Sequence, residues 1–138
     1  PPSHNIARAH MLGIAGTSDL TVHLLRAAAV PPRRRHLASR TYDLAAAADV
    51  HVPAWERRVV PLGLVLTPPA GCSARVESCP ELCARTGLQA LTFAPGNGDN
   101  EASVLLGNLS SAPTTVRAGE RVGLLALVRT DTPLVRLM

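Results

Sequence analysis

Two short stretches of the sequence have residue types that could bind phosphate. Gly96-Asn97-Gly98-Asp99-Asn100 could hold a phosphate with its backbone amides, although the same composition is typical of a plain hairpin loop. Arg33-Arg34-Arg35 could pair bidentately with phosphate oxygens or act as a nuclear-import signal. A solvated loop is the more ordinary role of such a run, because like charges repel and prefer water. Neither stretch identifies an activity on its own.

The cysteines and the short catalytic motifs add little. Cys72, Cys79 and Cys83 lack a Cys-x-x-Cys spacing and have no histidine nearby, so we expect free thiols in a reducing compartment and no zinc site. The sequence contains no Gly-x-Ser-x-Gly elbow, no Walker loop and no Gly-x-Gly-x-x-Gly motif. Any chemistry must therefore come from residues that the fold brings together.

Turn-forming residues divide the sequence into short aliphatic runs that predict β-strands. Pro61 and Gly63 predict a bend or bulge within residues 59–66. Alternation predicts that Arg75 and Glu77 point outward from their strand. Strands are expected at residues 20–25, 49–53, 59–66, 72–77, 88–93, 104–106, around 116, and at 122–128.

One short helix is predicted between Ser78 and Gly87. Ser78 and Glu81 have the spacing of a capping box, Pro80 suits the first turn, and Gly87 can adopt the left-handed conformation that ends a helix. Residues 45–48 are alanines that favour a helix by propensity, but they are too few to nucleate one. We expect an N-terminal arm or leader at 1–18, a single β-domain at 19–130 and an apolar tail at 131–138.

The composition excludes some classes of function. Tyr42, Trp55 and Phe93 are the only aromatic residues, which argues against a nucleic-acid binder that stacks bases. We expect Trp55 to pack against the aliphatic core. The formal charge of +4 is carried by arginines without any lysine and does not require a nucleic-acid partner. No apolar run approaches the roughly 20 residues of a membrane-spanning helix, so we expect a soluble protein.

From residue 20 to about 129 the order of features resembles the trimeric dUTPase family. Thr41-Tyr42-Asp43-Leu44, the turn Pro68-Pro69-Ala70-Gly71 and the motif Gly119-Glu120-Arg121-Val122 occur in the family's order. The resemblance implies an all-β fold, a distorted jelly-roll β-barrel with nucleotide sites between the subunits of a homotrimer. It also implies hydrolysis of dUTP to dUMP and pyrophosphate, with Asp43 at the position that holds a metal ion through water.

Other motif positions depart from the family. Ser78-Cys79-Pro80-Glu81 stands where the family has Pro-Arg-Ser-Gly, so an arginine that binds phosphate is lost and a carboxylate is added. The family's water-activating Asp falls on Pro95 or Gly96, which leaves Asp99 as a weak candidate base out of register. Leu124 replaces a glutamine, and the family's Gly-rich C-terminal arm has no counterpart in the sequence.

These departures favour a catalytically inactive, degenerate dUTPase-like domain, similar to the dUTPase-derived early proteins of adenoviruses. In this hypothesis the protein is viral, binds host proteins in the host cytoplasm or nucleus, and needs no cofactor or metal, while Asp43 is vestigial. The remodelled loops and the tail would supply the partner-binding residues, which are Arg33, Arg34, Arg35, Cys79, Glu81, Asn97, Asp99, Leu134, Val135, Leu137 and Met138.

Two alternatives remain open. The first is an active dUTP pyrophosphatase with divergent motifs, a site shared between subunits and Mg²⁺, in which Asp43 and Asp99 take part. The second is a structural assembly domain.

Overall fold

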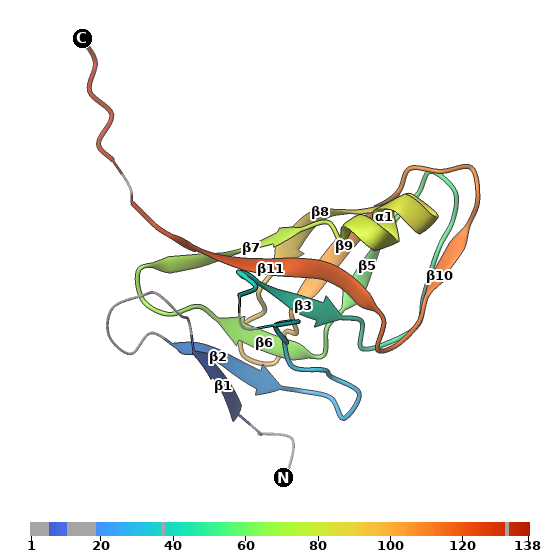
Figure 1. The fold of residues 1–138 in the computed structure, drawn as a ribbon, viewed down its shortest axis with the longest axis horizontal. Coiled ribbons are helices and arrows are strands. Elements are labelled where there is room, and N and C mark those ends of the chain that lie inside the picture. Colours follow the sequence, from blue (N-terminus) through green and yellow to red (C-terminus); the bar gives the residue numbers. More distant parts are fainter. Residues whose placement is uncertain (1–5, 11–18, 37, 132) are drawn as a thin grey trace.

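The computed structural model describes residues 6–10, 19–36, 38–131 and 133–138, with the backbone alone for 6–10. Short strands dominate this part of the chain and one helix interrupts them (Figure 1). In chain order the elements are β1 (Ile6–His10), β2 (Asp19–Leu24), β3 (Thr41–Ala45), β4 (Val50–Val52), β5 (Arg57–Pro61), β6 (Leu64–Thr67), β7 (Cys72–Glu77), α1 (Pro80–Thr86), β8 (Leu88–Ala94), β9 (Ser103–Asn108), β10 (Thr114–Val116) and β11 (Arg121–Arg129).

The strands pair antiparallel in small sheets that surround a common core. Their orders are β1-β2-β6, β10-β4, β3-β11-β7 and β5-β9-β8. Strand β11 is the central strand of its sheet, with Leu124 opposite both Asp43 of β3 and Glu77 of β7. The all-β prediction is confirmed. Among the described residues, however, the ladders remain separate sheets and do not close into one continuously bonded barrel.

The core is aliphatic, as the scarcity of aromatic residues predicts. Tyr42 is its aromatic member and is 6% exposed. Leucine and valine side chains from most of the sheets meet there, and each contributes about 1.5–3 kcal/mol by leaving water. Those that are almost fully buried include Leu20, Val22, Leu44, Val52, Val60, Leu62, Leu64, Leu66, Leu88, Val104, Leu106, Val116, Val122 and Leu125.

The short helix is present, but its predicted start is wrong. The Ser78 hydroxyl does not cap it, because Ser78 Oγ accepts a hydrogen bond from the Ala90 backbone N–H at 2.9 Å. The N-cap residue is Cys79, which makes no side-chain capping bond. The predicted end is confirmed, since Gly87 has φ +80° and its N–H donates to the Cys83 carbonyl at 2.8 Å. This helix is too short and too polar to cross a membrane, and the rest of the described chain holds no helix that could.

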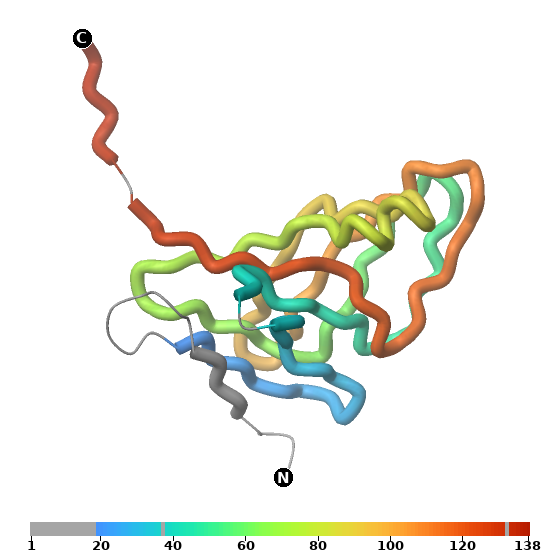
Figure 2. Tube along the Cα trace, in the orientation of Figure 1, coloured from blue at the N-terminus to red at the C-terminus, as the bar shows by residue number. Residues whose placement is uncertain are grey.

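Two further expectations need correction. Residues 6–10 are more than an arm, because they form β1 and pair with β2, while 1–5 and 11–18 lie outside the described residues. Trp55 is not buried in the core. It is 66% exposed and has φ +61°, in a turn where the Glu56 N–H donates to the Pro53 carbonyl. The last residues form the predicted tail, an irregular segment that extends away from the sheets (Figure 2).

Asn108 is the buried polar side chain of the described residues and ties three segments together. Its Nδ2 donates to the carbonyls of Val52 at 3.3 Å and Ala112 at 2.9 Å. Its Oδ1 accepts from the backbone N–H and the hydroxyl of Ser110 at 3.0 and 2.9 Å. The amide therefore joins the end of β9 to β4 and to the loop that leads to β10.

We expect Asn108→Ala to lower the free energy of unfolding by about 2–3 kcal/mol, because buried carbonyl and amide groups lose their partners. Urea denaturation measures the change. The matched control is Asn97→Ala at an exposed hairpin position, which should stay within about 0.5 kcal/mol of the wild type. Equal effects of the two substitutions would contradict the structural role of Asn108.

Candidate functional site

The best candidate site lies where β3, β11, the loop before β3 and the start of α1 meet. On β3, Tyr42 and Leu44 are buried while Asp43 is only partly buried, so alternation turns Asp43 away from the core. Arg121 is the first residue of β11 and pairs with Ala45, beside a register shift between Arg121 and Gly123. Strand pairing therefore puts a carboxylate and a guanidinium on the same outer surface.

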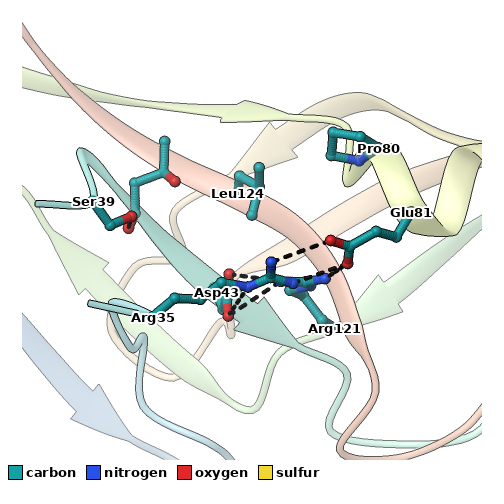
Figure 3. A pocket seen from close by; sticks show the side chains of 8 residues that line it. Arg35, Ser39, Asp43, Pro80, Glu81, Arg121 and Leu124 are labelled. Atoms are coloured by element: carbon teal, nitrogen blue, oxygen red, sulfur yellow. Dashed lines mark hydrogen bonds and ion pairs between the residues drawn. The ribbon is translucent and has the colours of Figure 1, made fainter.

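Four charged side chains converge there, and we call them the charge cluster: Arg35, Asp43, Glu81 and Arg121 (Figure 3). Arg121 Nη1 lies 3.3 and 3.4 Å from the two Asp43 carboxylate oxygens. Its Nη2 donates to Glu81 Oε2. Arg35 bonds Glu81 bidentately, with Nη1–Oε1 at 3.1 Å and Nη2–Oε2 at 2.9 Å, and its Nε lies 3.5 Å from Asp43 Oδ2. The cluster is neutral by formal charge.

Two cavities flank the charge cluster and share Arg35, Asp43 and Arg121. The first, of about 180 Å³, is also lined by Ser39, Thr41, Pro80, Glu81 and Leu124. The second, of about 320 Å³, is also lined by Val30, Arg33, Arg34, Ala45 and Gly119. One cavity therefore offers hydroxyl groups and a second carboxylate, whereas the other offers additional guanidinium groups.

The loop that carries the arginine run is anchored to the site by its backbone. The Asp43 N–H donates to the Arg33 carbonyl at 2.7 Å, and the Arg33 N–H donates to the Asp43 carbonyl at 3.3 Å. This isolated bridge fixes the loop beside β3. The arginine run is therefore more than a solvated loop, because Arg35 reaches across Asp43 to the first turn of α1.

The structure groups only some of the residues proposed from sequence. Arg33, Arg34, Arg35, Asp43 and Glu81 come together around the two cavities. Asn97 and Asp99 lie apart, in a hairpin closed by reciprocal backbone hydrogen bonds between Asn97 and Asn100 at 2.8 and 2.9 Å, and neither residue lines these cavities. Cys79 is 3% exposed and beneath the surface. The tail residues Leu134, Val135, Leu137 and Met138 are almost fully exposed, and their role as partner contacts stays a prediction.

Sequence reasoning missed the part played by Arg121, Ser39 and Thr41. Arg121 belongs to the motif Gly119-Glu120-Arg121-Val122, and that motif was the available signal for it. Thr41 is the first residue of β3 and belongs to the motif that contains Asp43, whereas Ser39 precedes the strand and had no distinguishing pattern. The contacts of Arg121 arise from tertiary structure, because Arg121 is 78 positions from Asp43 and 40 from Glu81.

The carboxylates of the site suit Mg²⁺ only in combination with a substrate. Within the described part of the chain, no group of three or more His, Cys, Asp or Glu residues could hold a metal ion. Mg²⁺ is often held by one or two carboxylates together with substrate phosphates and water. Asp43 and Glu81 meet that requirement, but their oxygens already accept from guanidinium groups. These two carboxylates fit an ion that arrives with a polyphosphate, and they are the residues that would hold it.

Comparison with known proteins defines the class of the fold. A mutant dUTPase of Staphylococcus phage 80alpha, solved with dUpNHpp, superposes with a TM-score of 0.75 at 20% identity and covers 86% of this chain and 90% of its own. The dUTPase of phage phi11 of S. aureus, whose mutant structure is described as showing the coordination of a structural Mg(II) ion, gives 0.70 at 19% identity over 86% and 95%. The fold is the jelly-roll fold of the dUTPases.

Sequence comparison shows which family the chain belongs to. A deoxyuridine 5′-triphosphate nucleotidohydrolase of Fowl adenovirus A serotype 1 is 38% identical over 112 residues, which are 76% of this chain and 60% of that protein. The enzyme of the same name from Mycolicibacterium vanbaalenii is 33% identical over 107 residues, 74% of this chain and 69% of the relative. No family model matches the sequence. The chain belongs to the deoxyuridine 5′-triphosphate nucleotidohydrolase, or dUTPase, family.

This finding corrects the functional hypothesis drawn from the motif departures. The relatives that match are named as hydrolases, so an inactive domain that binds host proteins is not what the comparisons support, and the expectation that the chain is not an enzyme is wrong. The physical reason lies in the charge cluster. Glu81 is not an isolated negative charge, because Arg35 and Arg121 neutralise it. An arginine also stands beside the second motif, although it comes from another loop.

The turn before Arg121 is held by Asp49. Asp49 Oδ1 accepts the Ala118 N–H at 2.8 Å, and Oδ2 accepts from Arg117 Nη1 at 3.2 Å. The Ala118 hydrogen bond, followed by the Arg117 contact, lowers the pKa of Asp49 from its usual 3.8. Since Gly119 lines the larger cavity, Asp49 supports the backbone of the site.

A lowered pKa means that Asp49 stabilises the fold above its ordinary pKa of 3.8 and loses this contribution as the pH falls below that value through the folded-state pKa. We expect Asp49→Asn to lower the melting temperature at pH 7 and to reduce its acid dependence in this range. Calorimetry from pH 2 to 7 would measure the melting temperature of each protein and its dependence on pH. The control is Asp131→Asn in the exposed tail segment. Parallel pH profiles for Asp49→Asn and wild type would contradict the assignment.

Proposed function

We propose that the protein is a dUTP nucleotidohydrolase that converts dUTP into dUMP and pyrophosphate, at a site shared between the subunits of a homotrimer. The observation that carries the proposal is the Asp43–Arg121 pair at the rim of two cavities, on strands of a chain 33% identical to a dUTPase across three quarters of its length. The solved structures, at 19% and 20% identity, support the fold alone.

The residues of the charge cluster suit the recognition of a triphosphate. Guanidinium groups pair bidentately with phosphate oxygens, and Arg35 and Arg121 both point to one region (Figure 3). Thr41 adds a hydroxyl group that can donate to the same oxygens, whereas the Ser39 hydroxyl donates to the Thr41 carbonyl at 3.0 Å. A divalent cation, when bound with the substrate, supplies positive charge on the triphosphate, and Asp43 would hold it through water.

The reaction breaks the bond between the α-phosphorus and the oxygen that bridges to the β-phosphorus. The oxygen of a water molecule forms a bond to the α-phosphorus, and the bridging oxygen leaves with the electron pair as part of pyrophosphate. A carboxylate takes up the proton of the water. Because Asp43 is engaged by Arg121 and Arg35, we assign this role to Asp99.

Asp99 acts in this scheme from a neighbouring subunit. It is exposed in the Asn97–Asn100 hairpin and does not line the cavities beside Asp43 of its own chain. A homotrimer with sites between subunits, the arrangement that the family resemblance implies, would let the hairpin of one copy approach the charge cluster of the next. The short turn, closed by its own backbone hydrogen bonds, would present the carboxylate from a fixed support.

Asp43→Asn should reduce dUTP turnover by at least about 100-fold, because the substitution removes the charge that holds the cation and orients Arg121. Pyrophosphate release from dUTP with Mg²⁺ measures the effect. Asp131→Asn, an exposed aspartate near the tail, is the matched control and should keep wild-type turnover. Wild-type protein that releases no pyrophosphate, or a variant as active as wild type, would refute the proposal.

A shared site makes a second prediction. Asp43→Asn and Asp99→Asn should each be inactive alone, but subunits of the two variants, mixed after mild denaturation and refolding, should recover about a quarter of the wild-type activity per site. That fraction is expected if each site takes one residue from each of two randomly mixed copies. Mixtures that stay inactive while sedimentation shows mixed trimers would contradict the shared arrangement.

A further inference from the structure

The position at which the family resemblance places a phosphate-binding arginine holds Cys79 in this chain. Its side chain is 3% exposed and carries no positive charge, so it cannot serve as a clamp. Two guanidinium groups from other elements contact Glu81 of this segment, those of Arg35 and Arg121. Arg35 is 46 positions away from Glu81 in sequence and bonds both of its carboxylate oxygens. A cation is therefore present beside this segment, although it comes from a different element.

We propose that the Arg33–Arg35 loop supplies the guanidinium groups that bind the triphosphate in this protein, and that the Glu81 carboxylate occupies the place of a phosphate group until substrate binds. The proposal rests on the proposed function and specifies which residues carry substrate affinity. The ligand chemistry is a linear triphosphate, either free or as part of a nucleotide.

The charges around the larger cavity favour this assignment. Arg33, Arg34, Arg35 and Arg121 line it together with Asp43, which is its single acidic lining residue. Even with Glu81 counted from the adjoining cavity, four guanidinium groups face two carboxylates, so the formal charge is +2. A volume of about 320 Å³ is ample for a triphosphate chain. Anions are therefore attracted to this side of the charge cluster.

The backbone holds the loop in place for such a role. The reciprocal hydrogen bonds between Arg33 and Asp43, at 2.7 and 3.3 Å, fix its first arginine directly beside β3. Arg35 then spans the distance from Asp43 to α1. Phosphate-binding side chains on a fixed backbone lose less conformational freedom on binding, and the planar guanidinium fork suits bidentate contacts.

Glu81 has the properties of a displaceable anion. Its side chain is 63% exposed, whereas those of Arg121 and Asp43 are 21% and 28% exposed. Ion pairs with such an exposed partner are screened by water and contribute little to stability. A triphosphate, with more negative charge and more acceptor oxygens than a carboxylate, can replace Glu81 on Arg35 and Arg121 without disturbing buried contacts.

Binding of inorganic triphosphate to the full chain, measured by titration calorimetry without a divalent cation, tests the proposal. Arg35→Gln should weaken binding at least about tenfold, and Arg33→Gln should weaken it several-fold, because each substitution removes one guanidinium. Glu81→Gln should strengthen binding several-fold by removing the competing carboxylate. The controls are Arg58→Gln on β5 and Glu77→Gln on β7, exposed side chains that line neither cavity.

Unchanged affinity in both Arg35→Gln and Arg33→Gln, with melting temperatures showing that the variants fold, would overturn the proposal. Weaker triphosphate binding by the Glu81→Gln variant than by the wild type would also overturn the proposal. A parallel titration with dUTP separates this inference from the proposed function. If the arginine variants lose triphosphate affinity as expected but the wild type never hydrolyses dUTP, only the hydrolase assignment fails. If dUTP turnover and KM are normal in the arginine variants, only the loop assignment fails.

Discussion

The pairing of β11 with β3 and β7 is the constraint on which the site depends. A strand in the centre of a sheet has its register fixed on both sides, since a shift by one residue would turn Val122 and Leu125 out of the core. That register places Arg121 at the start of the central strand, near Asp43. The aliphatic core thereby determines where the charges stand, although it makes no contact with a substrate.

Local patterns predicted most of the fold. Aliphatic runs separated by Pro, Gly and Asn indicated the strands, and Pro61 with Gly63 marked the break between β5 and β6. The predicted start of the helix was wrong because the Ser78 hydroxyl accepts a hydrogen bond from the Ala90 N–H, 12 residues further along, which is a tertiary contact. The predicted burial of Trp55 was wrong for a related reason, since its place in a turn with positive φ outweighs the usual tendency of tryptophan to be buried.

The candidate site could be predicted only in part. Asp43 was found through its motif, and the arginine run through its charge. The contact between Arg35 and Glu81 could not be found in this way, because the two residues belong to separate elements and neither has a local pattern that identifies its partner. Considered one position at a time, Glu81 would repel phosphate and Cys79 would leave the site without a clamp. In three dimensions the acidic side chain is paired, and another loop supplies positive charge. Loss of a motif residue is therefore weak support for loss of activity when a neighbouring loop can reach the same point.

The exposed position of Trp55 has a practical consequence for spectroscopy. It is the only tryptophan of the chain, and its indole is already largely surrounded by water in the native fold. Its emission maximum will lie near that of the free amino acid before and after denaturation, so intrinsic fluorescence will follow global unfolding poorly. The same indole, positioned on a tight turn outside the core, is well suited to report quenching by a macromolecule that covers this turn.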